Sequence, residues 1–196
     1  MNKATKLTLL AAALVAAAGC FNEPEPAYKS VPAENRVYLS DKGLKEVPAV
    51  NAKADYLNLD RNALTNVDAV AALTELKWLR LNDNRLAALP DLKALASLRR
   101  IYLRNNRFTA VPETLKDLPS LTDVDLSGNP IKEVPQWLVE KRGLKNLSFS
   151  RTQVTRLPEN LEAWASLQCL QLGDLSISAA EMARIRRALP NVAIVF

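Results

Sequence analysis

Leucines recur at fixed intervals through most of this 196-residue chain, and that repetition limits its possible folds more than any other feature. Four segments fit one template, L-x-x-L-x-L-x-x-N-x-L-x-x-L-P, and begin at Leu76, Leu98, Leu121 and Leu144. The last of them has threonine in place of the asparagine. Internal repetition with a period of about 20–50 residues indicates a solenoid or a related repeat architecture.

Weaker copies extend the pattern in both directions. They begin at Glu34, Ala54 and Leu167, and a fragment begins at Leu189. Successive starts are 20, 22, 22, 23, 23, 23 and 22 residues apart. Over residues 34–196 the chain resembles the leucine-rich repeat family. The resemblance implies an α/β solenoid of horseshoe shape, with about seven repeats of 20–23 residues and one short parallel strand in each.

Each L-x-x-L-x-L segment predicts one short strand whose apolar residues turn inward. No single repeat can bury them alone, so stacking must create the core. The chain turns at the asparagine position, where we expect side-chain amides to form a buried ladder that satisfies backbone groups. The ladder residues are Asn62, Asn84, Asn106 and Asn129. Lys42, Thr152 and Leu175 replace asparagine in the first, sixth and seventh repeats, where we expect looser or differently bonded turns.

Residues 177–196 predict a C-terminal cap, because an open solenoid end exposes its core. The segment from Ser178 to Glu181 (S-A-A-E) matches a capping box. It predicts a helix with one apolar face, followed by an edge strand that contains Ile194. We interpret the basic residues of this helix as a solvent-facing surface. They are Arg184, Arg186 and Arg187.

Side chains at template positions 3, 5 and 7 are predicted to point outward and to line a concave wall. Tyrosine, tryptophan and arginine, which dominate binding hot spots, gather there in the first four repeats. The predicted partner-binding residues are Tyr38, Tyr56, Trp78, Arg80, Arg100, Tyr102, Arg104, Asp123 and Asp125. Eight strands give a wall of about 34 Å by 17 Å, or roughly 580 Å². That is less than the roughly 800 Å² that each partner buries in a standard interface.

The same outward residues also permit a purely structural interpretation. Parallel strands lie about 4.8 Å apart, so outward neighbours in adjacent repeats touch. Trp78, Arg100 and Asp123 could form a ladder of cation–π and ion-pair contacts within the sheet. Arg80, Tyr102 and Asp125 offer a second ladder of this kind. On this interpretation the chain is a scaffold that uses its rim or convex surface.

The first nineteen residues have the features of an export signal. Lys3 and Lys6 precede an apolar run of twelve residues, which is too short to span a bilayer as a helix. The sequence A-A-G-C that ends at Cys20 resembles the lipobox of bacterial lipoproteins, whose pattern is L-A-G-C. The resemblance implies cleavage before Cys20 and its lipidation, with residues 20–33 as a disordered tether. Phe21, in place of aspartate, favours the outer membrane if the cell is Gram-negative. An ordinary signal peptide with an incidental cysteine is the alternative.

Composition excludes several function classes. Histidine is absent, which removes the serine and cysteine catalytic triads that depend on imidazole, as well as imidazole metal sites. The net charge of +5 falls to +3 without Lys3 and Lys6, since 24 basic residues then face 21 acidic ones. Acidic and basic residues are balanced on the predicted wall, which disfavours nucleic acid. The pair Asp123 and Asp125 is more simply explained by charge pairing with Arg100 than by catalysis or cation binding.

These observations together predict a non-enzymatic, lipid-anchored protein of the bacterial envelope that binds another protein through its concave wall. We expect no cofactor, metal or small-molecule substrate. The alternative is the envelope scaffold described above.

Overall fold

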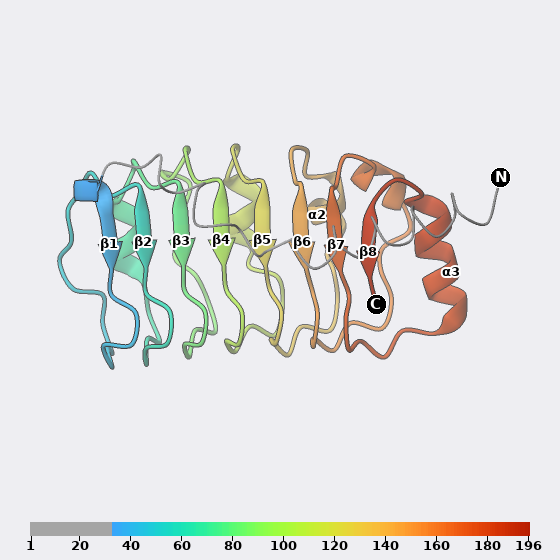
Figure 1. Ribbon diagram of the computed structural model, residues 1–196, viewed down its shortest axis with the longest axis horizontal. Helices are drawn as coiled ribbons and strands as arrows, with labels where there is room; N and C mark the ends of the chain where they lie inside the picture. Colours follow the sequence, from blue (N-terminus) through green and yellow to red (C-terminus); the bar gives the residue numbers. More distant parts are fainter. Residues whose placement is uncertain (1–32) are drawn as a thin grey trace, which may run out of the picture.

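The computed structural model of the chain describes residues 33–196. Its strands form one parallel eight-stranded sheet in which the spatial order is the sequence order (Figure 1). The strands are β1 (Arg36–Tyr38), β2 (Tyr56–Asn58), β3 (Trp78–Arg80), β4 (Arg100–Tyr102), β5 (Asp123–Asp125), β6 (Asn146–Ser148), β7 (Cys169–Gln171) and β8 (Ala193–Val195). This architecture confirms the predicted leucine-rich repeat solenoid. The predicted signal peptide, Cys20 and nearly all of the predicted tether lie outside the described residues.

The sheet places equivalent residues of successive repeats beside one another. The middle residue of each strand points into the core, and Leu57, Leu79, Ile101 and Val124 are all fully buried. Leucines from the later part of each repeat pack behind them in one continuous cluster. The core therefore runs through the stack, as the stacking argument requires.

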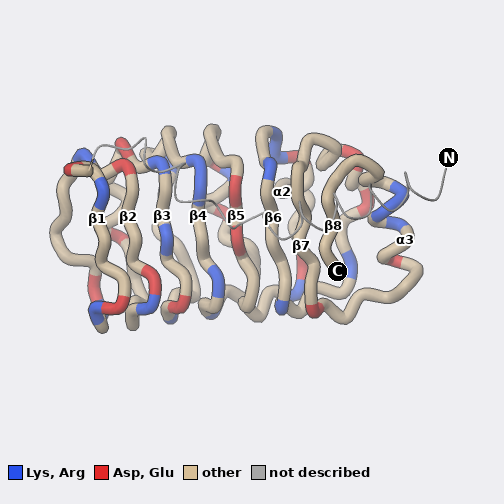
Figure 2. Tube along the Cα trace, viewed as in Figure 1, with Lys and Arg blue, Asp and Glu red and all other residues tan. Residues whose placement is uncertain are grey.

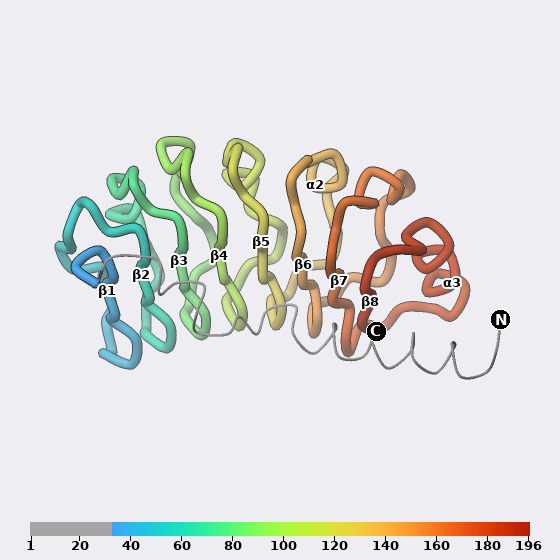
Figure 3. The backbone as a smooth tube through the Cα atoms, turned by 45° about the horizontal axis from the view of Figure 1, so that its top comes forward, coloured from blue at the N-terminus to red at the C-terminus, as the bar shows by residue number. Residues whose placement is uncertain are grey.

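Short helical turns close the side of the solenoid opposite the sheet (Figure 3). They are η2 (Asp68–Ala72), η3 (Glu113–Asp117), α2 (Gln136–Glu140) and η4 (Leu161–Trp164); a further turn, η1 (Ala33–Asn35), precedes β1. Leu115 and Leu118 anchor η3, and Leu161 and Trp164 anchor η4, all in the core. The indole nitrogen of Trp164 donates to the carbonyl of Leu138 in the previous repeat, at 3.0 Å.

An asparagine amide joins each of the central repeats to its neighbour. Nδ2 of Asn106 donates to the carbonyls of Leu103 in its own repeat (3.0 Å) and Leu81 in the previous one (2.9 Å). Its Oδ1 accepts the backbone N–H of Leu86, at 3.0 Å. The same arrangement recurs at Asn62, Asn84 and Asn129. One side chain therefore satisfies three buried backbone groups that no strand or helix pairs.

The residue before the ladder position has a left-handed backbone in every one of the seven repeats. Its φ lies between 53° and 67° at Asp41, Arg61, Asp83, Asn105, Gly128, Arg151 and Asp174. The first, sixth and seventh repeats therefore keep this turn although they lack the asparagine. They differ in bonding: the Lys42 N–H donates to Asn62 of the next repeat, at 3.1 Å. At Gly128 a side chain is also excluded, because a Cβ would lie 2.1 Å from Oδ1 of Asn105.

The C-terminal cap is α3 (Ala179–Ala188), and Ser178 caps it by accepting the N–H of Glu181 at 3.2 Å. The capping box is only half formed, because the Glu181 carboxylate accepts from Leu157 N (2.9 Å) and Arg184 instead. Arg184 in turn donates to the carbonyls of Leu157 (2.7 Å) and Pro158 (3.1 Å). The interpretation of Arg184 as a solvent-facing residue is wrong: it fastens the cap to the sixth repeat.

The final strand has a different register from the one that the sequence spacing predicts. Cys169 pairs with Ala193 and Leu170 with Ile194, so the last repeat is offset by 24 residues. Leu189 does not start that repeat; it is buried at the end of α3.

We predict that Asn106→Ala lowers the free energy of unfolding by about 3 kcal/mol, because it leaves three buried backbone groups without partners. Urea unfolding measures this loss. Thr109→Ala, at an exposed position of the same repeat, is the control and should cost less than about 0.5 kcal/mol. Equal losses in the two variants would show that the amide does not stabilise the stack.

The cap should also respond to pH. Hydrogen bonds from Arg184 are the main cause that holds the pKa of Glu181 below its ordinary value of 4.5. A lowered pKa means that the ionised carboxylate stabilises the fold above pH 4.5, and that this contribution is lost as the pH falls through the folded-state pKa. We therefore expect wild type to melt above Glu181→Gln at neutral pH, and the difference to shrink in acid. A difference that is constant with pH would contradict this assignment; the exposed Glu162→Gln is the control.

Candidate functional site

The outward side chains of the strands form columns that run along the sheet. We call this surface the strand face: the side chains at template positions 3, 5 and 7 of the seven repeats. The strand register places Tyr56, Trp78, Arg100 and Asp123 in one column. Asn58, Arg80, Tyr102 and Asp125 form the next. All nine predicted contact residues lie on this face, because Tyr38 and Arg104 occupy positions 5 and 7 of the first and fourth repeats.

Side chains in the position-3 column contact one another in sequence. The rings of Tyr56 and Trp78 meet edge to face, with centroids 5.8 Å apart. The guanidinium of Arg100 lies 4.4 Å from the Trp78 ring centroid, and its Nε lies 3.6 Å from Oδ2 of Asp123. Nδ2 of Asn146 then donates to Asp123 Oδ1, at 2.6 Å. The cation–π and ion-pair ladder suggested by the sequence is present in this column.

The position-5 column differs from its prediction at the acidic end. Arg80 does lie over the Tyr102 ring, 5.4 Å from its centroid. Asp125, however, accepts hydrogen bonds from the backbone N–H (2.9 Å) and hydroxyl (2.5 Å) of Ser127, in the turn that follows β5. The partner of the Asp125 carboxylate is therefore a serine two residues along the chain, where the sequence suggested a ladder with Arg80 and Tyr102.

The acidic partner of Arg80 is Asp60, which the sequence analysis did not identify. Nε and a terminal nitrogen of Arg80 each lie 2.8 Å from Oδ2 of Asp60. Asp60 occupies position 7 of the previous repeat and is buried. Its Oδ1 also accepts the N–H of Asn82, at 2.8 Å. The sequence did contain a signal for this pair. Asp60 carries the charge opposite to that of Arg80 and lies in the preceding repeat, two template positions further along.

Accessibility divides eight of the nine predicted contact residues into two groups; the side chain of Arg100, at 20% exposed, lies between them. Tyr56, Trp78, Tyr102, Asp123 and Asp125 are each less than a tenth exposed. Tyr38 is 51% exposed, and the side chains of Arg80 and Arg104 are 37% and 46% exposed. The accessible group lies toward the carboxyl ends of the strands, so a partner would meet that edge of the strand face first.

Charges on the strand face and on the turns that follow the first three strands are paired across neighbouring repeats; in Figure 2, for example, blue on β4 lies beside red on β5. Arg61 meets Asp41 at 2.6 Å, and Arg104 approaches Asp83 at 3.9 Å. Burial raises the pKa of Asp125, and the Ser127 hydrogen bonds and the nearby Arg104 and Arg151 oppose that rise. The face consequently has no single sign of charge to attract a polyanion or a polycation.

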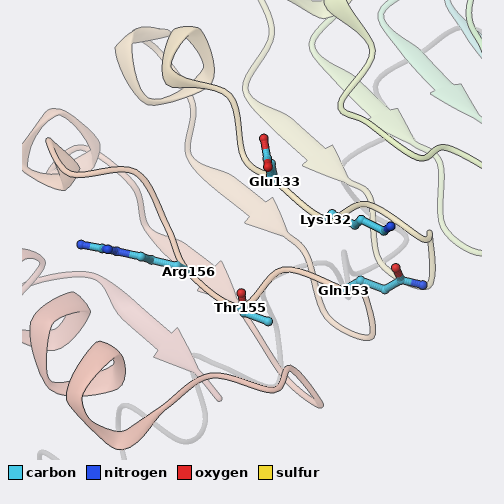
Figure 4. A pocket seen from close by; sticks show the side chains of 5 residues that line it. All are labelled: Lys132, Glu133, Gln153, Thr155 and Arg156. Carbon is cyan, nitrogen blue, oxygen red and sulfur yellow. The ribbon is translucent and has the colours of Figure 1, made fainter.

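A hollow of about 470 Å³ lies away from the strand face, on the loops that follow β5 and β6 (Figure 4). It is lined by Lys132, Glu133, Gln153, Thr155 and Arg156. The hollow occurs where Thr152 takes the ladder position and no amide is available to bridge the two repeats. Its lining mixes both signs of charge and is polar throughout.

The part of the chain from residue 33 onward offers no group of acidic or cysteine side chains arranged to hold a metal ion. Over the same range, no helix is both long enough and apolar enough to cross a membrane.

One comparison with known proteins, a match to a family model, agrees with the repeat pattern. A family model described as "Leucine rich repeat" matches residues 74–131. No curated protein matches the chain. Among solved structures, an LRR protein of Leptospira interrogans aligns at 25% identity and a TM-score of 0.45. That alignment covers 73% of this chain and 55% of the other, so the chain spans little more than half of that protein's length.

We predict that Trp78 and Arg100 stabilise the sheet together. In a double-mutant cycle of Trp78→Leu and Arg100→Met, followed by urea unfolding, the coupling should be about 1 kcal/mol, as expected for a partly desolvated cation–π contact. Trp78→Leu combined with Arg151→Met, three repeats away, is the control and should show no coupling. Absence of coupling in the first pair would mean that the contact is energetically neutral.

Proposed function

The chain is a leucine-rich repeat protein, and we propose that it binds another protein through its strand face. Solenoids of this kind present extended surfaces that serve as protein-binding sites and are not generally enzymes. The observation that carries the proposal is the accessible group on the strand face, Tyr38, Arg80 and Arg104, fixed on a stiff sheet. Tyrosine and arginine contribute most often to binding hot spots, and a rigid wall loses little entropy when a partner docks.

Contacts within the columns determine which residues are available to the partner. Arg80 is held by Asp60 and Tyr102, so its guanidinium is presented in one orientation. Arg104 is 3.9 Å from Asp83 and more exposed, which leaves most of its hydrogen-bonding groups accessible. Tyr38 rests against Tyr56, with ring centroids 5.3 Å apart, and keeps half of its surface exposed. These three side chains are preorganised for contact with polar and aromatic groups of a protein.

The alternative function is that of a scaffold that uses its rim or outer surface. The position-3 ladder favours it, since contacts among Trp78, Arg100 and Asp123 give these residues a role within the sheet. The two functions differ in which surface a partner touches. They can therefore be separated by substitutions on opposite sides of the solenoid.

We expect Arg104→Ala and Tyr38→Ala, tested singly, to reduce partner capture about tenfold, as is typical of a hot-spot residue. The measurement is crosslinking of the full chain in intact cells, followed by mass spectrometry. Lys116→Ala and Arg142→Ala, at exposed positions on the outer side, are the controls. Loss of capture in the controls but not on the strand face would reject the proposal in favour of the scaffold.

We further propose that the protein is attached to the cell envelope by lipid on Cys20, in the outer membrane if the cell is Gram-negative. Support comes from the sequence: two lysines, an apolar run and A-A-G-C at residues 17–20. Several acyl chains on one residue would hold the protein at a membrane stably, which a single chain does not.

Cys20→Ser should therefore move the protein from the membrane fraction to the soluble fraction of lysed cells. Thr109→Ala, at an exposed position and with both cysteines retained, is the control and should stay with the membrane. Retention of Cys20→Ser in the membrane fraction would show that lipid on this residue is not the anchor.

A further inference from the structure

Basic residues outnumber acidic ones on the turns that follow the strands of the fourth, fifth and sixth repeats. We call this surface the turn flank: the side chains at template positions 8–13 of these repeats, residues 105–110, 128–133 and 151–156. It has one acidic residue, Glu133, and four basic ones, which are Arg107, Lys132, Arg151 and Arg156. The equivalent turns of the first three repeats have four basic and three acidic residues. The excess of positive charge on the turns therefore begins at the fourth repeat.

The charge pairing of the earlier turns also ends at the fourth repeat. Asp83, the last acidic residue of those turns, accepts a hydrogen bond from Nδ2 of Asn105 in the fourth repeat, at 2.6 Å. Further along, Arg107, Lys132 and Arg151 form no ion pair with any carboxylate of residues 33–196. All three side chains are exposed. A row of exposed cations without partner carboxylates attracts negatively charged groups.

The polar hollow described above opens on this turn flank (Figure 4). Its lining residues occupy template positions 10–13 of the fifth and sixth repeats. Lys132 and Gln153 extend toward one end of the hollow, and Arg156 extends toward the other (Figure 4). Arg156 is already paired with Glu159. The end with Lys132 and Gln153 therefore offers an ammonium group and an amide, whose N–H groups suit a carboxylate.

The turn flank adjoins the accessible group of the strand face. Arg104 occupies position 7 of the fourth repeat, and Arg107 follows it three residues later in the same turn. Both side chains are exposed. A protein that docks on Arg104 therefore has the turn flank beside its contact surface.

We propose that the turn flank binds a short acidic segment of the protein partner, with one carboxylate of that segment in the hollow beside Lys132. This inference rests on the proposed binding through the strand face and specifies the charge of the partner. Neighbouring repeats are about 4.8 Å apart, so the three turns span about 10 Å. An extended segment rises about 3.3 Å per residue, and three or four of its residues cross that distance. Acidic side chains at alternate residues, about 7 Å apart, can then reach both Arg107 and Arg151.

Two other kinds of polyanion fit the turn flank less well. Bases of a nucleic acid stack on exposed aromatic side chains, and the one aromatic residue of the flank, Phe108, is buried. An anionic bilayer is disfavoured by the position of Ala33, which lies at the edge of the sheet where the strands begin (Figure 1). The residues that carry the proposed lipid on Cys20 join the solenoid at Ala33, whereas the turn flank lies at the opposite edge.

Binding of a fluorescein-labelled octaglutamate peptide to the full chain, measured by fluorescence anisotropy at low ionic strength, tests the turn flank directly. We expect Arg107→Glu combined with Arg151→Glu to weaken binding about tenfold, because the reversed charges repel the peptide. The matched control is Arg99→Glu combined with Lys145→Glu. These two residues are exposed and basic and belong to the same two repeats, but they lie where the strands begin. The control changes the net charge equally and should weaken binding about twofold or less.

Lys132→Gln tests the hollow and should weaken binding of the peptide about threefold, because it removes one charge. Thermal melting at the wild-type temperature shows that each variant is folded. Four results would overturn the proposal: no binding of octaglutamate by wild type, equal weakening in the two double variants, wild-type affinity in Arg107→Glu with Arg151→Glu, or wild-type affinity in Lys132→Gln.

Tyr38→Ala separates this inference from the proposed function, because the first repeat lies outside the turn flank. This variant should bind octaglutamate as wild type does and still lose partner capture. Failure of octaglutamate to bind, together with loss of capture in Tyr38→Ala, would reject the acidic segment and retain the strand face as the binding site. Normal peptide binding with undiminished capture in Tyr38→Ala and Arg104→Ala would reject the strand face instead.

Discussion

Stacking is the constraint on which the rest of this structure depends, because no repeat is wide enough to bury its own leucines. Each repeat contributes one strand of three residues and a return segment, and a residue such as Leu79 is covered only by the repeats on both sides. The turns at the strand ends must then pass through the interior. Asparagine amides make that possible, because one side chain hydrogen-bonds to backbone groups of two repeats. These buried groups are therefore not left without partners.

The same stacking determines the chemistry of the strand face. Every outward residue has its nearest neighbours one repeat before and one repeat after it, so charges become paired along columns. Arg100 lies between Trp78 and Asp123, and Arg80 between Asp60 and Tyr102. A surface organised in this way is rigid and electrically balanced. Such a surface favours a protein partner, recognised by shape and by a few exposed side chains, over a polyelectrolyte.

The two ends of the stack differ in how the core is covered. At the C-terminal end α3 replaces a missing neighbour, and the Glu181–Arg184 pair fastens it to backbone groups of the sixth repeat. At the other end the first repeat, with β1 as the first strand of the sheet, has apolar side chains that are only partly buried. A solenoid requires a cover at each end for the same reason that it requires neighbours in the middle.

Periodicity alone determined the fold, the inward leucines and the asparagine ladder, because a fixed repeat length places equivalent residues beside one another in neighbouring repeats. The ladder residues Asn62, Asn84, Asn106 and Asn129 could therefore be identified from spacing. Tertiary structure decided what spacing does not encode: Asp60 as the partner of Arg80, Ser127 as that of Asp125, Arg184 as part of the cap and the offset of 24 residues at β8. A polar side chain reaches several neighbours at similar distance. Which of them it bonds to therefore depends on geometry that forms only when the repeats have stacked.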